Sequence, residues 1–277
     1  MNNTIRTTLL LGALTGILLF FGSVFGGRAG MVFAFGFAVI MNMGAYWYSD
    51  KIVLRLFKAQ PVSETQDPSL YRIVRDLSTR AGLPMPRVYR IPNPSPNAFA
   101  TGRNPENAVV AVTDGIRELL TDDELAGVIG HELAHIGHRD ILVSSIAATL
   151  AGAVMMLAYI ARWAFFLGGR GDEDRNPIGA LALAILAPIA AVIIQMAISR
   201  SREYQADATG AKIAGSPLPL ASALEKLSAA AKGIPMEANP ATSHMFIVKP
   251  FSGRSLLQLF STHPPVEKRI AKLKNRS

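Results

Sequence analysis

Four long segments without any charged residue constrain this chain most strongly. They cover residues 7–25, 29–48, 141–161 and 177–199. At a rise of about 1.5 Å per residue, each is long enough as a helix to cross about 30 Å of hydrocarbon. Half of the 277 residues are hydrophobic and 17% are charged, which is too apolar for an ordinary soluble domain. The sequence therefore predicts a predominantly α-helical membrane protein with four transmembrane helices.

Two other interpretations of these segments stay open. The first segment could be a signal peptide, although its apolar run exceeds the usual length and a second span follows at once. The alanine-rich segments 141–161 and 177–199 could be buried helices of a soluble core. Their length and their lack of charge favour spanning, but the sequence does not decide whether they cross the bilayer fully.

Basic residues near the ends of the spans predict the orientation of the chain. Lys51, Arg55 and Lys58 follow the second span, and Arg200 and Arg202 follow the fourth. Because basic residues are enriched on the cytosolic side, both termini and residues 49–140 should lie in the cytosol. The net charge of +8 also fits a lipid bilayer as partner. No basic block is interleaved with aromatic residues, so nucleic acid is not expected as a partner.

Between the two pairs of spans, the pattern is that of a small α+β unit. Asp67 and Pro68 begin a helix that Gly82 ends. Strands are expected over Arg87–Ile91 and residues 108–112, joined by a proline-rich connection that leads into a short strand. The capping box TDDE at residues 121–124 opens another helix. Further helices are expected over three later segments: residues 199–214, residues 216–232 and the tail after residues 263–265.

The helix opened by the capping box carries the stretch HELAH at residues 131–135. His131 and His135 lie four residues apart, so both rings project from one face and can bind one zinc ion. Glu132 is rotated by about 100°, near such an ion but not bound to it, where a general base for water must lie. The chain has no cysteine, so any metal must be held by His, Asp or Glu.

A catalytic zinc site needs a third protein ligand. His138 lies seven residues beyond His131 on the same helix, too far along the axis. Glu203 is the better candidate, because an antiparallel hairpin of spans three and four would bring its helix beside the histidine helix. Asp207 lies one turn further on the same face, placed to accept a ring N–H from a ligating histidine. The other interpretation of Glu203 and Asp207 is a solvated pair that balances neighbouring arginines.

Four ordered motifs resemble the HtpX family of membrane-bound zinc metalloproteases, which are gluzincins distantly related to the CAAX prenyl endopeptidases. They are HELAH at 131–135, SREYQAD at 201–207, NAFATG at 97–102 and STHPPVEKRI at 261–270. The resemblance covers essentially the whole chain. It implies a multi-pass endopeptidase of the bacterial inner membrane, with a zincin-like domain and its active site in the cytosol. It also implies cleavage of misfolded or damaged membrane proteins in stress-linked quality control.

For the site, the resemblance implies that His131, His135 and Glu203 bind one zinc ion per chain and that Glu132 is the catalytic acid and base. Four domains follow from the motifs and spans. They are a transmembrane hairpin over residues 1–50, a cytosolic catalytic subdomain over 51–140, a second hairpin over 141–199, and a cytosolic helical subdomain over 200–277 that carries the third ligand.

Two further motifs have weaker signals. Asn97, Ala98 and Phe99 could begin an edge strand to which an extended substrate adds by backbone pairing, or could belong to an ordinary hairpin strand. His263 precedes two prolines, which fix the loop rigidly. It could support the transition state as a hydrogen-bond donor, or it could be a plain loop histidine.

These observations together predict a zinc-dependent endopeptidase that acts on membrane proteins or unfolded polypeptides. One alternative is an endopeptidase that processes prenylated proteins, which would need an intramembrane chamber built from more spans than four. Another is a membrane scaffold or chaperone in which the histidine motif is structural. The sequence predicts neither the native substrates and cleavage preference, nor the regulatory partners, nor the oligomeric state.

Overall fold

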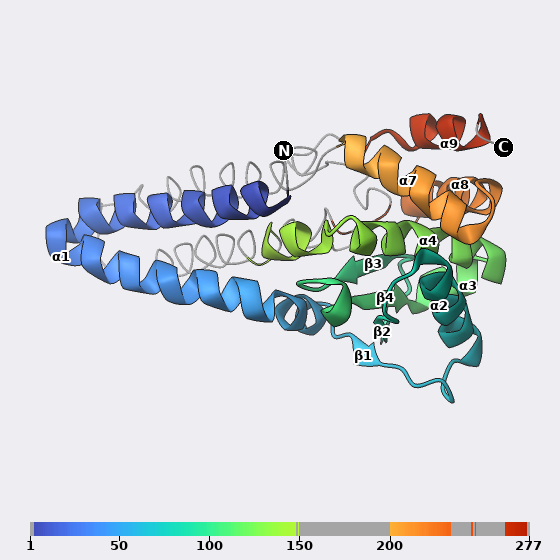
Figure 1. Cartoon of the computed structure of the whole chain (residues 1–277), viewed down its shortest axis with the longest axis horizontal. Coiled ribbons are helices and arrows are strands. Elements are labelled where there is room, and N and C mark those ends of the chain that lie inside the picture. Colours follow the sequence, from blue (N-terminus) through green and yellow to red (C-terminus); the bar gives the residue numbers. More distant parts are fainter. Residues whose placement is uncertain are drawn as a thin grey trace, which may run out of the picture.

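The computed structural model describes residues 3–147, 149, 200–233, 245, 247 and 264–275. The predicted span over residues 177–199, most of the span over 141–161, and His263 lie outside the described residues. Residues 141–147, the start of the third span, are helical. Within the described part the chain is mostly helical with one small sheet, as the sequence predicts (Figure 1).

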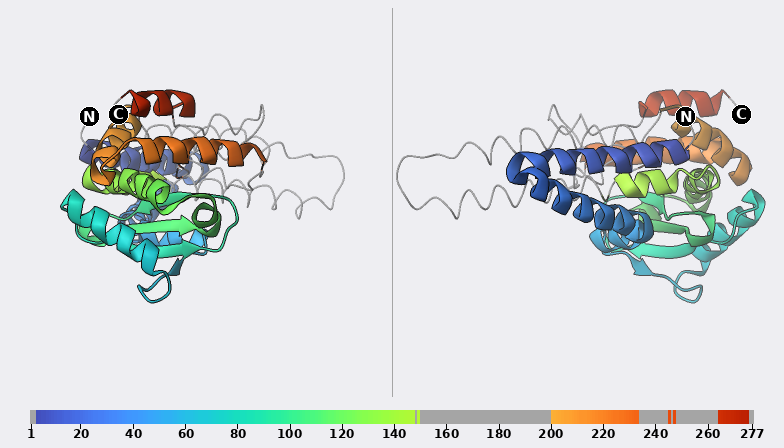
Figure 2. Two further views of the ribbon diagram at one scale, coloured as in Figure 1. Left: turned by 90° about the vertical axis from the view of Figure 1, so that its right-hand side faces the viewer. Right: turned by 60° about the vertical axis from the view of Figure 1, so that its left-hand side comes forward.

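The first element, α1 (Asn3–Leu56), is a helical hairpin. Gly27 has φ 55°, a backbone conformation that glycine adopts readily, and the chain reverses there. Figures 1 and 2 show the two arms side by side, and Asn42 Nδ2 donates to Thr15 Oγ1 across them at 2.9 Å. The second arm continues to Leu56, beyond the predicted end at Tyr48. The charged residues after Tyr48 end the apolar segment but not the helix.

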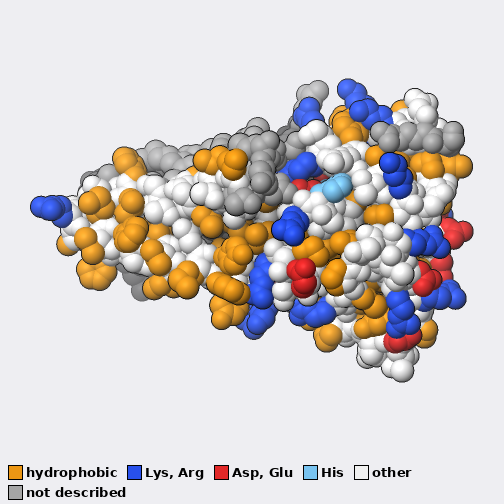
Figure 3. Space-filling view, in the orientation of Figure 1, with side chains coloured by type: hydrophobic (Ala, Val, Ile, Leu, Met, Phe, Trp, Pro, Cys, Tyr) orange, Lys and Arg blue, Asp and Glu red, His pale blue; other side chains and the backbone are white. Residues whose placement is uncertain are grey.

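The second arm has the properties of a membrane helix. Gly26–Leu56 is the one helix in the described part of the chain that is long and apolar enough to cross a membrane. Only 11% of its apolar segment is buried inside the protein. The first arm contains a shorter apolar helix, Thr7–Phe20. Phe33 is 81% exposed and Ile40 is 70% exposed. Figure 3 shows hydrophobic side chains spread along this hairpin, while acidic side chains gather on the domain. Such an apolar surface fits a lipid environment.

Beyond the hairpin, four strands form one sheet in the order β1-β2-β4-β3. The strands are β1 (Gln60–Pro61), β2 (Arg87–Ile91), β3 (Ala98–Thr101) and β4 (Val109–Thr113). β2 is parallel to β4, whereas β1 and β3 are antiparallel to their neighbours. β2 agrees with its predicted bounds, and β4 begins one residue later than expected. The two-residue strand β1 is too short to have left a pattern in the sequence.

The sheet is covered on both faces, because successive side chains of a strand point to opposite sides. Ala98, Ala100 and Val110 belong to the main core, with residues of α2 and the later helices. Phe99 and Val109 lie on the other face, in a cluster with residues of α1. The members of that cluster from α1 are Val53 and Leu54. The end of the membrane hairpin is therefore packed directly onto the sheet.

Capping residues predict both ends of one helix and the start of another. Asp67 caps α2 (Pro68–Ala81) by accepting from the Leu70 amide, and Gly82 ends it with φ 65°. Thr121 and Glu124 form the capping box of α4 (Asp122–Gly137). The other described helices are η1 (Pro105–Asn107), α3 (Asp114–Leu119), α7 (Arg200–Ala214), α8 (Leu218–Gly233) and α9 (Val266–Lys274).

α4 lies at the centre of the domain, in contact with α2, β3, α7 and α8. Its start is tied to α8 through Glu124, which accepts from Ser222 at 2.7 Å and from Lys226 at 2.7 Å. Burial acts to raise the pKa of Glu124, but the bonds from Lys226, Ser222 and Thr121 outweigh it and lower the pKa to about 2.

Replacing Glu124 by glutamine should lower stability by roughly 1–3 kcal/mol at pH 7, because hydrogen bonds to a charged acceptor are lost. The pKa is lower in the folded chain than in the unfolded one, so this contribution is present above about pH 4.5 and disappears as the pH falls toward about 2. Thermal unfolding of parent and variant in detergent should therefore differ at pH 7 and differ clearly less near pH 3. A gap of equal size at both values would contradict this assignment.

Candidate metal centre

The backbones of α4 and α7 lie in direct contact. A Cβ placed on Gly210 of α7 would lie 2.6 Å from the backbone nitrogen of His131, and one on Gly130 would lie 2.8 Å from the Gly210 carbonyl oxygen. Only glycine permits so close an approach. The contact brings the histidine face of α4 against the first turn of α7, although some 70 residues separate them in the sequence.

Three candidate ligands converge between these helices. His131 Nε2 lies 3.2 Å from His135 Nε2. The Glu203 carboxylate lies 3.8 Å from His131 Nε2 and 3.5 Å from His135 Nε2. His131 and Glu203 are buried, and the His135 side chain is 16% exposed. One donor atom from each of the three residues falls within 4.8 Å of the others. The site therefore opens to its surroundings on the His135 side.

Each histidine is held at its other ring nitrogen by a buried aspartate. Asp207 Oδ1 lies 2.9 Å from His131 Nδ1, and Asp140 Oδ2 lies 3.1 Å from His135 Nδ1. A carboxylate at Nδ1 keeps the proton there and directs the lone pair of Nε2 toward a metal. Asp207 thus lies beside a histidine, as the sequence predicts, whereas the sequence does not predict the contact of Asp140.

Arg269 of α9 completes the buried part of the site. It is fully buried and donates to both oxygens of Asp207, at 2.9 and 2.7 Å, and to the Ile247 carbonyl at 3.0 Å. Its Nη1 also lies 3.9 Å from Glu203. Burial acts to raise the pKa of Asp207, but the charge of Arg269 and the bond to His131 lower it well below its usual range. Asp207 is therefore ionised when it holds His131.

The charges around His135 favour its protonated form in the metal-free chain. Burial acts to lower its pKa, but the hydrogen bond to Asp140 and the charges of Glu203 and Glu132 outweigh burial and raise the pKa to about 9. A metal ligand must be neutral imidazole, so binding of a cation displaces this proton.

Glu132 lies beside the ligands and faces the edge strand. Its side chain is buried, and its Oε2 accepts a hydrogen bond from the Ala100 amide of β3 at 2.8 Å. β3 pairs with β4 on one side only among the described strands. The Ala100 amide points away from β4, so in an antiparallel ladder the Ala98 backbone groups face the same outer side.

The other residues of the predicted edge strand are buried and differ in their roles. Asn97 precedes β3; its Oδ1 accepts from the Ile247 amide at 3.3 Å, and its buried Nδ2 has no partner in the described part of the chain. Ala98 lies in the main core. Phe99 packs against Phe57, which directly follows the hairpin, with ring centroids 4.8 Å apart, so its side chain lies on the opposite face of the sheet.

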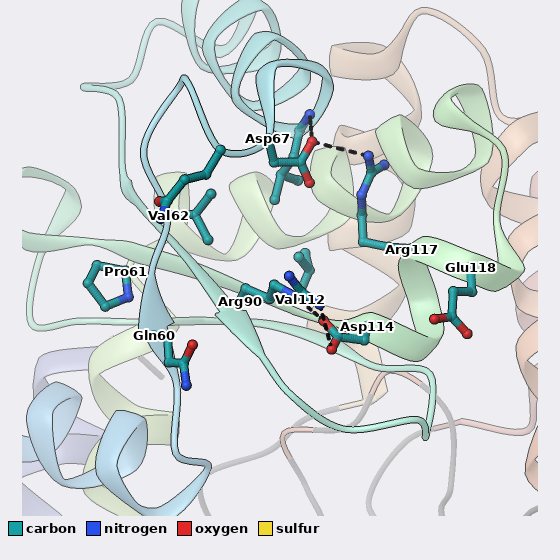
Figure 4. A pocket seen from close by; sticks show the side chains of 11 residues that line it. Gln60, Pro61, Val62, Asp67, Arg90, Val112, Asp114, Arg117 and Glu118 are labelled. Carbon is teal, nitrogen blue, oxygen red and sulfur yellow. Dashed lines mark hydrogen bonds and ion pairs between the residues drawn. The ribbon is translucent and has the colours of Figure 1, made fainter.

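A cavity of about 540 Å³ lies elsewhere, beside β1, α2 and α3. Figure 4 shows that four of its five charged side chains pair with one another: Arg90 with Asp114, and Arg117 with Asp67. None of the three converging ligands lines it. The chemistry therefore belongs to the centre between α4 and α7.

The residues of that centre fit a divalent cation. Two imidazole nitrogens bound at about 2.0–2.1 Å to a tetrahedral ion would lie about 3.3 Å apart. The observed separation of 3.2 Å matches this value. One buried carboxylate beside two imidazoles, each imidazole supported at its second nitrogen, is a ligand set found in metallopeptidases.

Comparisons with known proteins agree with this chemistry. Residues 64–277 match the model of peptidase family M48. The chain is 59% identical to the protease HtpX homolog of Syntrophobacter fumaroxidans, over 99% of this chain and 100% of that one. It is 54% identical to the protease HtpX homolog of Thermococcus sibiricus, over 98% of this chain and 94% of that one.

A solved structure has a similar fold. The crystal structure of S. mikatae Ste24p matches 98% of this chain and 65% of its own length, with a TM-score of 0.53 and 21% sequence identity. The chain thus spans about two thirds of that protein. The family match covers most of the chain, and one described helix is apolar enough to cross a membrane. This chain belongs to peptidase family M48 and is a membrane-associated metalloprotease.

Proposed function

We propose that this metalloprotease is a zinc-dependent endopeptidase of the bacterial inner membrane that cleaves misfolded or damaged membrane proteins. His131, His135 and Glu203 are its zinc ligands, and Glu132 is its catalytic acid and base. The observation that carries this proposal is the convergence of the three donors, with Glu132 between them and the edge strand.

When bound, zinc makes water a stronger acid and polarises the scissile carbonyl. Glu132 accepts a proton from the attacking water, whose oxygen bonds to the carbonyl carbon. As the C–N bond breaks, Glu132 returns that proton to the amine nitrogen of the leaving strand. Its carboxylate is already fixed by the Ala100 amide, so little reorganisation is needed.

The edge strand suggests how substrate is held. An extended segment can pair with the outer side of β3 through the Ala98 backbone and the Ala100 carbonyl, since the Ala100 amide donates to Glu132. Asn97 Nδ2, which has no partner among the described residues, is one further donor at the start of this strand. Such pairing requires an unfolded backbone, which supports damaged or misfolded chains as substrates. An unfolded soluble polypeptide fulfils the same requirement.

The membrane topology belongs to the same proposal. The hairpin α1 supplies two spans, and residues 141–161 and 177–199 supply two more. Lys51 and Arg55 at the end of α1 are exposed, and by the positive-inside bias they support a cytosolic position for the adjoining domain. Because the end of α1 packs onto the sheet, the edge strand lies near the membrane surface.

Reconstitution with metal tests this function. Detergent-purified chain is stripped with a chelator, and casein or an unfolded membrane protein is added with zinc or magnesium. Internal cleavage should return with about one equivalent of zinc and not with magnesium. A peptide with a farnesylated C-terminal tail should be cut no faster than its unmodified form. Absence of cleavage with zinc restored, or strict dependence on the prenyl group, would contradict the proposal.

A further inference from the structure

Asp140 lies where α4 ends and the next helix begins. Arg139 has a left-handed backbone, with φ 58°, which is uncommon for a residue other than glycine. The Asp140 amide donates to the His135 carbonyl at 2.9 Å, and residues 141–147 continue as helix. This turn brings the side chain of Asp140 back to the ring of His135, and the residue is only 3% exposed.

The two oxygens of Asp140 contact groups from two different helices. Oδ2 lies 3.1 Å from His135 Nδ1 on α4. Oδ1 accepts from Arg202 Nη1 on α7 at 2.8 Å. Arg202 directly precedes Glu203 in the sequence. One buried carboxylate therefore connects a ligand on α4 with the residue next to a ligand on α7.

The Asp207 carboxylate beside His131 also connects the two helices, but it does so from its own position on α7, one turn after Glu203. Its arginine partner, Arg269, comes from α9 and not from a helix that carries a ligand. Asp140 instead lies just after the end of α4 and reaches the start of α7 through Arg202, next to Glu203. A shift of Asp140 would turn the His135 ring and release the first turn of α7 together.

We infer that Asp140 and Arg202 are a positioning pair that sets the zinc affinity of the centre. Asp140 fixes the His135 ring so that Nε2 faces the metal, and through Arg202 it holds the backbone that presents Glu203. The inference rests on the proposed function, in which His135 and Glu203 are ligands. Carboxylates that orient a ligating histidine typically change metal affinity by about 10–100-fold when removed.

The test measures zinc affinity of the full chain in detergent by competition with a chromophoric chelator. Asp140→Ala should weaken binding about 100-fold. Asp140→Asn should weaken it about tenfold, because one amide oxygen must serve two donors. Arg202→Gln should weaken it less than Asp140→Ala. The double variant Asp140→Ala/Arg202→Gln should bind as Asp140→Ala does, because the two residues act as one unit.

Glu124→Gln is the matched control. It also removes a buried, ion-paired carboxylate from α4, but at the end of the helix away from the ligands. It should lower the Tm and leave zinc affinity unchanged. If the Asp140 variants lower the Tm and bind zinc as tightly as the parent, the pair is structural only and the inference is wrong. A parent chain that binds no zinc would contradict the metal centre itself, and this inference with it.

Discussion

Replacing Glu132 by glutamine is expected to lower kcat by about 10²–10⁴-fold while zinc stays bound, because the variant cannot accept or return a proton. Glutamine has nearly the same size, and its amide oxygen can still accept from the Ala100 amide. The geometry of the site is therefore kept, and the loss reports the proton transfer alone. Product formation from casein, measured by mass spectrometry at saturating substrate, checks the rate.

Glu118→Gln is the control for that substitution, since Glu118 is an exposed glutamate of α3. It should leave kcat within about twofold of the parent, as surface substitutions usually do. Zinc content of the Glu132 variant is measured on the same preparation. Activity within tenfold of the parent, with zinc bound, would show that another group accepts the proton.

The largest expected effect on stability comes from Arg269. Arg269→Met removes the only fully buried arginine of the described chain and leaves the Asp207 carboxylate buried without its arginine partner. Breaking one side of a buried ion pair costs about 3–5 kcal/mol. Thermal unfolding in detergent should show a Tm lowered by roughly 10 °C. Zinc affinity should fall as well, because Asp207 then no longer fixes His131.

Two companion variants make this prediction specific. Lys268→Met changes an exposed residue of the same helix and should alter stability by no more than about 0.5 kcal/mol. Asp207→Asn combined with Arg269→Met removes both charges and should be more stable than Arg269→Met alone. An Arg269 variant as stable as the parent would mean that the buried pair contributes nothing to the fold.

Local patterns in the sequence were sufficient for much of this site. The capping box places the start of α4, and the i, i+4 spacing then puts His131 and His135 on one face whatever the rest of the fold. The prediction of Glu203 as a ligand required one assumption, that spans three and four form a hairpin. The close contact of α7 with α4 at Gly210 provides the proximity that this prediction needed. Caps likewise predicted both ends of α2.

Residues that reach the site only through tertiary packing could not be predicted. Arg269 lies 138 positions beyond His131, inside the motif STHPPVEKRI, but the other described basic residues of this tail are exposed and the motif alone assigns Arg269 no role. Asp140 follows His135 by five residues, and on a continuous helix a side chain at that spacing points away from the ring. Asp140 reaches His135 because the left-handed turn at Arg139 brings it back. The Ala100 amide is a backbone group, and its contact with Glu132 depends on how β3 packs against α4.

Metal content tests the central claim most directly. Detergent-purified parent chain should contain about one zinc per chain, whereas Glu203→Ala, produced in the same way and shown to be folded, should retain little or none. Full zinc occupancy in that variant, or a folded parent that holds no metal, would contradict the claim that α4 and α7 build one metal centre.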